Sequence, residues 1–129
     1  MCVAATKRRQ VFSGWLMCSA VLLLSACSEP APDVEIDGNV EQGRALLTSA
    51  GCGSCHEIPG VTGAQGRVGP PLDQLVRRGY LAGILPNTPD NLVRWIADPQ
   101  AIAPGSAMPD TGVTRAEAID IAAYLYTLD

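Results

Sequence analysis

Five consecutive residues, Cys52-Gly53-Ser54-Cys55-His56, constrain this chain more than any other part of its sequence. Over one helical turn, cysteines at i and i+3 and a histidine at i+4 bring two thiols and an imidazole together. Thiols with this spacing can bond two vinyl groups on one edge of a porphyrin, while the imidazole reaches the iron. The motif therefore predicts one covalently attached c-type haem, held by Cys52 and Cys55, with His56 as an iron ligand.

Three other uses of this cysteine pair fit the sequence less well. A structural zinc site needs four ligands, but the chain has a single histidine, His56. A thioredoxin-like redox pair belongs to a βαβ pattern, and we find none. A simple disulfide would not require the adjacent histidine. Haem attachment is the interpretation that uses all three side chains.

The first 26 residues have the features of an export signal. The basic residues 7–9 precede an apolar stretch over 11–24, which is shorter than the roughly 20 residues of a membrane-spanning helix. The residues that follow resemble the lipobox of bacterial lipoproteins and end at Cys27. We therefore expect cleavage after residue 26, a lipid anchor on Cys27, and a location on the periplasmic side of a bacterial membrane. The alternative is an ordinary signal peptide that is cut nearby, with Cys27 incidental.

The charged residues indicate how the exported chain is divided. Residues 7–9 account for three of the nine basic residues, so six basic residues face thirteen acidic ones after cleavage. Five of these acids precede Arg44. From Arg44 onward six basic residues face eight acidic ones, and this lack of excess positive charge argues against a nucleic acid partner. Residues 27–38 contain too few apolar side chains to pack and are predicted to be a tether. The remaining residues, 39–129, form the predicted domain.

Capping signals predict where the helices of this domain begin. Asn39 is expected to cap a first helix by accepting from the Gln42 backbone, with the Gln42 side chain reaching back. Thr88 precedes a proline and starts another helix, which must end before Pro99. Thr114 opens a capping box for the last helix. A short helix is predicted over 73–78, stopped by a glycine.

Apolar periodicity predicts which helix faces are buried. Val40, Gly43, Leu47 and Ala50 share one face of the first helix. The stripe of the last helix is flanked by a tyrosine and comprises Ala118, Ile121, Ala122, Leu125 and Leu128. No convincing strand pattern is present, so we predict an all-α fold of four or so short helices. A domain of this size commonly needs an additional stabilising cross-link or bound group, which a covalent haem would supply.

A second iron ligand is predicted in the loop over 104–109. This loop is bounded by prolines, and Met108 within it lies on no apolar helical face. The other two methionines belong to the export signal, so Met108 is the candidate that remains. Histidine and methionine together are the ligands of electron-transfer cytochromes. The alternative is Met108 as core filler beside an open or water-bound iron.

From about Glu41 to the end, the sequence resembles class I cytochromes c. It is most similar to the cytochrome domain at the C-terminal end of subunit II of caa3-type cytochrome c oxidases. The residues that carry this likeness are Gly51, Cys52, Cys55, His56, Gly60, Val68, Gly69, Pro70, Leu72, Arg78, Leu85, Pro86, Asn87, Asn91, Leu92, Trp95, Ile96, Asp98, Pro99, Gln100, Pro104, Gly105, Met108, Pro109, Tyr124 and Leu125.

The resemblance implies roles for four further residues. It implies that the Pro70 carbonyl accepts a hydrogen bond from His56 and that Arg78 lies near a haem propionate. It also implies that Trp95 packs on the methionine side of the haem. Gly43 is expected to let the first helix cross the last closely, against Ile121 and Tyr124, because a mid-helix glycine needs a packing reason.

These features predict a lipid-anchored, monohaem carrier of single electrons in a respiratory chain. Both axial positions have a candidate ligand and no acid–base group is evident, so we do not expect an enzyme. No copper-binding domain precedes residue 39, so we do not expect the oxidase subunit itself. Redox partners would be a terminal oxidase or a quinol-oxidising complex. The alternatives are a fixed haem subunit of a membrane oxidoreductase complex and, from another class, an open-site gas-binding or catalytic cytochrome.

Overall fold

The computed structural model describes residues 34–128, so the predicted export signal, Cys27 and most of the predicted tether lie outside the described residues. Among the described residues, no helix is long and apolar enough to cross a bilayer. In chain order the elements are α1 (Val40–Ser49), the 3-10 turns η1 (Cys52–Ser54) and η2 (Leu75–Arg77), strands β1 (Tyr80–Leu81) and β2 (Leu85–Pro86), and helices α2 (Pro89–Ala97), α3 (Pro99–Ile102) and α4 (Arg115–Leu125). The all-α prediction is confirmed, and the strands form only a minimal hairpin.

Helix α1 begins where the sequence predicts but is capped differently. The Asn39 side chain accepts from the Gln42 N–H at 2.9 Å, as expected for an N-cap. The Gln42 side chain was predicted to satisfy the Asn39 N–H in return, and this is wrong. That N–H donates instead to Asp120 Oδ1 of α4, at 2.8 Å. A partner 81 residues away in the sequence is supplied only by packing of the two helices.

The starts of α2 and α4 follow the prediction. The Thr88 hydroxyl accepts from the Asn91 N–H, and the capping box of α4 is complete between Thr114 and Glu117. An exposed ion pair between Arg115 and Asp90, at 2.7 Å, joins the first turns of these two helices. The two helix starts thus lie side by side.

Three local elements differ from the prediction. The helix expected over 73–78 is only the 3-10 turn η2, because Gln74 has a left-handed backbone with φ of +49°. The hairpin was not foreseen, and its register pairs Tyr80 with Pro86 and Leu81 with Leu85. Its strands are too short for any sequence period to appear. Helix α3 was also missed because it begins immediately after α2 ends.

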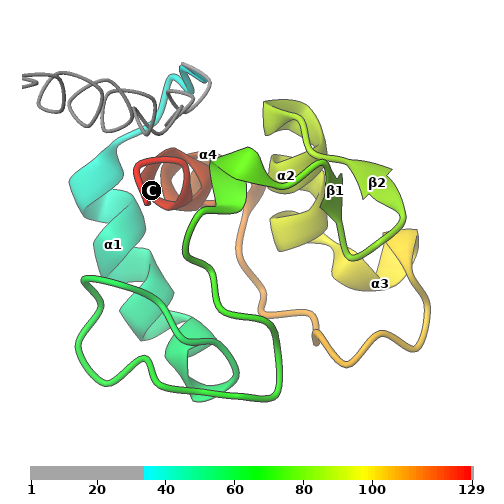
Figure 1. The fold of residues 1–129 in the computed structure, drawn as a ribbon, viewed down its shortest axis with the longest axis horizontal. Coiled ribbons are helices and arrows are strands. Elements are labelled where there is room, and N and C mark those ends of the chain that lie inside the picture. The colour runs from blue at the N-terminus through cyan, green and yellow to red at the C-terminus, as the bar shows by residue number, and fades with distance from the viewer. Residues whose placement is uncertain (1–33, 129) are drawn as a thin grey trace, which may run out of the picture. The chain divides into compact units, whose positions relative to one another are not determined.

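Helix α4 is the element around which the domain is built. It packs against both α1 and α2, and Figure 1 views it nearly along its axis while α1 lies across it. At the centre of the core, Leu47 of α1 and Ile121 of α4 are each 1% exposed. Val40 was predicted on the buried face of α1, but it is 41% exposed; the buried residues of α1 are Gly43, at the crossing with α4, and Leu47.

Gly43 has the packing reason that the sequence predicted. A Cβ atom at this position would lie 1.9 Å from the Asp120 carbonyl oxygen of α4. The atoms of α4 nearest to this position are backbone atoms of Asp120 and Ile121. The two helices therefore approach each other more closely than a side chain would allow.

Gly43→Ala should destabilise the domain although alanine is the better helix former. Helix propensity alone would favour alanine by roughly 1 kcal/mol. The clash with the α4 backbone should reverse this and cost about 1–3 kcal/mol, as overpacking commonly does. Denaturant unfolding of the haem-loaded protein measures the change. The exposed α1 variant Ala45→Gly is the control, and it should lose only about 1 kcal/mol. A stabilised Gly43→Ala protein would contradict the close crossing.

Candidate functional site

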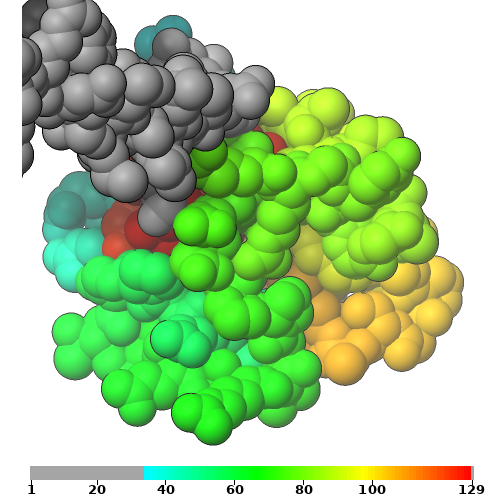
Figure 2. Space-filling view, in the orientation of Figure 1, coloured from blue at the N-terminus to red at the C-terminus, as the bar shows by residue number. Residues whose placement is uncertain are grey.

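The residues that the sequence singled out surround one cavity of about 470 Å³. Its lining includes all seven candidates that lie in the described chain, namely Cys52, Cys55, His56, Pro70, Arg78, Trp95 and Met108. Leu47, Leu92, Ile96 and Ile121 contribute apolar wall from α1, α2 and α4. In Figure 2 the green segment between η1 and η2 and the orange segment after α3 form neighbouring parts of the surface. The cavity is thus lined by helices and by both loops.

The cysteine–histidine motif forms a tight turn at the edge of this cavity. η1 begins at Cys52, whose carbonyl oxygen accepts from the backbone N–H groups of Cys55, at 3.2 Å, and His56, at 3.0 Å. Both cysteines are free thiols, so they form no disulfide in the structure. Burial raises the pKa of the Cys52 thiol, which favours its protonated form. Two thiols and an imidazole therefore converge on one site, as the spacing predicts.

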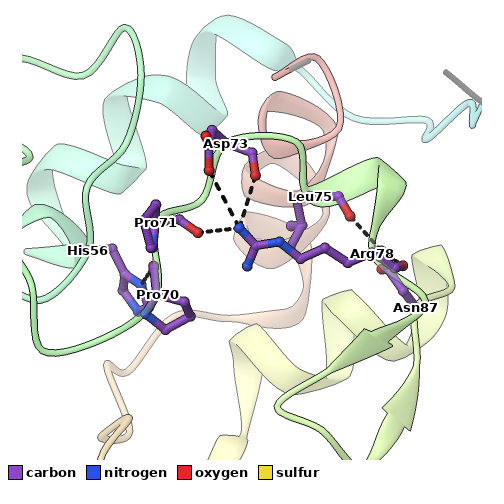
Figure 3. Close-up of polar contacts among 7 residues, drawn as sticks. All are labelled: His56, Pro70, Pro71, Asp73, Leu75, Arg78 and Asn87. Carbon is purple, nitrogen blue, oxygen red and sulfur yellow. Dashed lines mark hydrogen bonds and ion pairs between the residues drawn. The ribbon is translucent and has the colours of Figure 1, made fainter. Parts of the chain in front are cut away.

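The His56 ring is fixed by the segment at residues 69–70. Its Nδ1 lies 2.7 Å from the Pro70 carbonyl oxygen, so Nδ1 carries the proton that it donates (Figure 3). This leaves the Nε2 lone pair available to a metal. A Cβ atom at Gly69 would lie 2.2 Å from His56 Cε1, so only glycine permits this approach. The hydrogen bond implied by the resemblance is present.

Arg78 lines the cavity and is held by the turn before η2. Its Nη2 donates to the carbonyl oxygens of Pro71 and Asp73 and lies 3.6 Å from Asp73 Oδ1 (Figure 3). These contacts engage one of the guanidinium nitrogens and orient the group. The structure brings Arg78 to the site, and its contact with a propionate stays a prediction.

Asn87 is a site-supporting residue whose role the sequence did not reveal. Its Nδ2 donates to the carbonyl oxygens of Leu75 and Arg78, at 2.7 and 2.9 Å, and so holds η2 together. Its Oδ1 accepts from the Tyr126 hydroxyl at 2.6 Å. Asn87 carried part of the family resemblance, but that signal gave no role. Through it, the C-terminal end of α4 fixes the backbone that carries Arg78.

Met108 reaches the cavity from the loop between α3 and α4. Its N–H donates to Ser106 Oγ at 3.2 Å, and its side chain joins the cavity lining. Trp95 of α2 is half-buried and lines the same cavity. The sequence predicted both residues at the site, and the structure places both there.

The chemistry of this lining fits a covalently held haem. Two thiols can form thioether bonds, while the imidazole of His56 and the thioether of Met108 are both iron ligands. The wall is largely apolar, and it contains one guanidinium but no carboxylate. Such a wall suits a mostly hydrophobic macrocycle with an acidic edge. An imidazole with one fixed tautomer and a thioether are together a suitable pair of iron ligands.

Comparison with known proteins gives the same result. The family model described as cytochrome c matches residues 40–129, most of the chain. The chain belongs to the cytochrome c family. A cytochrome c binds covalent haem c, so the motif at Cys52, Cys55 and His56 has the cofactor that the sequence predicted. The class I cytochrome c fold agrees with the short helices around one cavity.

Three relatives are similar to this cytochrome c over part of their own length. Cytochrome c oxidase subunit 2 of Alkalihalophilus pseudofirmus is 37% identical over 53% of this chain. The same subunit from Bacillus sp. (strain PS3) is 33% identical over 74% of the chain. A cytochrome c homolog of Bradyrhizobium diazoefficiens is 32% identical over 81% of the chain. The matches span only 19%, 28% and 62% of these relatives, in that order.

The Asn87–Tyr126 contact predicts an alkaline loss of stability. Burial raises the pKa of Tyr126 to about 12, above its ordinary value near 10. The folded state thus prefers the neutral phenol, whose contribution is complete below pH ~10 and is lost as the pH rises through ~12. Tyr126→Phe should lower the free energy of unfolding by about 1 kcal/mol at pH 7. It should also reduce the further decrease in stability between pH ~10 and ~12, because the titrating hydroxyl is absent. Denaturant unfolding between pH 7 and 12 measures both effects.

Thr62→Ala is the control for this prediction, because it removes a hydroxyl at an exposed position outside the cavity lining. It should leave the stability at pH 7 within about 0.5 kcal/mol of the unaltered protein. An unchanged stability in Tyr126→Phe, or an unchanged alkaline slope, would show that the hydroxyl does not support the site.

Proposed function

We propose that this cytochrome c is a monohaem carrier that passes single electrons, with His56 and Met108 as its two axial ligands. The observation that carries the proposal is that both side chains line the cavity whose edge holds Cys52 and Cys55. The sequence contains one such cysteine–histidine motif, which supports one haem for each chain. With a ligand on each side, no position is left for a substrate, which favours electron transfer over catalysis.

Each element of the site has a part in this function. The haem supplies a one-electron couple whose potential depends on its axial ligands and surroundings. His56 keeps its proton on Nδ1 through Pro70, so Nε2 stays a donor to the metal. The apolar wall excludes water, and Arg78 offers a positive charge to the acidic edge of the macrocycle. Rigid surroundings of this kind favour rapid electron transfer because little has to rearrange.

We also propose that the protein is a lipoprotein, anchored through Cys27 on the periplasmic side of a bacterial membrane. The basic and apolar residues of 1–26 and the small residues before Cys27 support this. Residues 27–38 would then be the tether; Ile36 and Gly38 at its end pack against the domain, so residues 27–35 are the part that can extend, over about 30 Å. A respiratory role follows, because a carrier on this surface is within reach of membrane oxidoreductases.

Redox partners of this carrier would be a terminal oxidase or a quinol-oxidising complex. Two of the relatives are named as oxidase subunits, which also favours a second candidate, a fixed haem subunit of a membrane oxidoreductase complex. Purification in mild detergent separates the two. A carrier should elute alone, with one haem and a one-electron redox titration, whereas a subunit should bring its partners.

Met108→Ala tests the axial ligand. Residues 28–129 contain no lysine and no histidine besides His56, so no nitrogen ligand is available to replace the thioether. The variant should therefore bind carbon monoxide when reduced and show a lower reduction potential. Magnetic resonance of the oxidised form should show no nitrogen-ligated low-spin substitute. Carbon monoxide titration and redox titration measure the effect.

Thr48→Ala, an exposed position on α1, is the control for Met108→Ala and should behave as the unaltered protein. Rapid carbon monoxide binding before any substitution would favour the open-site alternative. A methionine-ligated spectrum that survives in Met108→Ala would remove Met108 from the iron.

Cys27→Ser tests the anchor. Without acyl chains on residue 27 the protein should be released in soluble form or remain unprocessed, because the acyl chains are what hold a lipoprotein on the membrane. Fractionation after a salt wash, with mass spectrometry of the N-terminus, measures this. Cys18→Ser is the matched control, since bulky residues precede Cys18, and it should stay anchored. Normal processing with full membrane retention in Cys27→Ser would contradict the lipoprotein assignment.

A further inference from the structure

The loop that carries Met108 has little regular structure to hold it. It runs from the end of α3 at Ile102 to the start of α4 at Arg115, with no helix or strand between them. Ala107 and Pro109, on either side of Met108, belong to no helix or strand and line the same cavity. A thioether on such a loop faces the cavity for most of the time only if other groups fix the backbone around it.

One side chain supplies most of that restraint. The Gln100 Nε2 donates to the carbonyl oxygens of Ser106, at 3.0 Å, and Met108, at 2.6 Å. Its Oε1 accepts from the Gly105 N–H at 3.0 Å. A single amide thus spans the loop from Gly105 to Met108 and satisfies three backbone groups that no helix or strand pairs.

Gln100 is itself held on a rigid base. It lies in α3, whose N-cap Asp98 accepts from the Ala101 N–H at 2.9 Å. Pro99, immediately before it, is among the most buried side chains of the core. The Gln100 side chain therefore extends from a fixed point, and the loop takes its shape from that point.

The three hydrogen bonds of Gln100 require an amide with the length of a glutamine side chain. A glutamate at neutral pH could accept from Gly105 but could not donate to the two carbonyl oxygens. A leucine of similar size could do neither. An asparagine is one methylene shorter and could not span the same three groups. The geometry therefore selects glutamine rather than a polar residue in general.

We propose that Gln100 is the positioning residue for Met108, and that its amide keeps the thioether directed into the cavity. This inference rests on the proposed role of Met108 as an axial ligand. Gln100 is not among the residues that line the cavity, so it acts through the loop and not on the haem. Without it, the loop opens more often and the iron is exposed on that side for a larger fraction of the time.

Gln100→Leu is the primary test. The open fraction of the loop should rise roughly 100-fold, the effect of losing three hydrogen bonds. The rate at which the reduced protein binds carbon monoxide should rise by the same factor, because the gas enters only when the thioether leaves. The methionine–iron absorption of the oxidised form should weaken. Hydrogen exchange at the Gly105 amide should accelerate, since Gln100 is its acceptor.

Gln100→Glu separates the two ends of the amide. The carboxylate keeps the acceptor for Gly105 but loses both donor bonds. Exchange at Gly105 should therefore stay near that of the unaltered protein, while carbon monoxide binding still accelerates. This variant also carries the test if Gln100→Leu does not fold. If Gln100→Glu accelerated exchange at Gly105 as well as carbon monoxide binding, the substitution would have caused a general loss of stability, and that result would contradict the proposal.

Gln42→Leu, at an exposed position of α1, is the matched control and should leave every readout unchanged. Met108→Ala provides the fully open reference. If it binds carbon monoxide rapidly while both Gln100 variants keep the rate of the unaltered protein, the positioning role is wrong and the ligand assignment stands. If Met108→Ala itself binds no faster, the ligand assignment fails and this inference with it.

Discussion

The interior of this domain is organised around an apolar cavity of about 470 Å³. Its walls include the core side chains Leu47, Leu92 and Ile121, which would meet water if the cavity were left unfilled. The group that fills it is therefore part of the core. Helices α1, α2 and α4 and the loops between them contribute wall to this cavity. The covalent attachment at η1 makes this filling permanent.

The loops around the cavity keep their shape through side chains rather than through regular backbone pairing. His56 fixes the carbonyl of Pro70, Asn87 fixes those of Leu75 and Arg78, and Gln100 fixes those of Ser106 and Met108. Each contact satisfies backbone groups that would otherwise need water. Each also positions one residue of the site, namely His56, Arg78 or Met108. Scaffold and site are thus stabilised by the same hydrogen bonds.

The sequence predicted those features that depend on neighbouring residues. The turn at Cys52, the helix starts at Thr88 and Thr114 and the buried stripe of α4 follow from local spacing and capping chemistry. The prediction failed where a local rule met a contact from a distant element. The Asn39 N–H pairs with α4 instead of Gln42, and Val40 is exposed although its spacing puts it on the face of Leu47. A left-handed backbone at Gln74 reduced an expected helix to one turn.

The sequence by itself determined the cofactor chemistry of this protein, because two thiols and an imidazole within five residues suit few groups besides a haem. It also named Met108, since no other methionine is available outside the predicted signal. Only the tertiary structure decided how that methionine is held. The amide of Gln100 and the backbone groups it binds are separated by five to eight residues and by the end of a helix. Side-chain hydrogen bonds to irregular backbone follow no period, so they emerge only when the chain has folded.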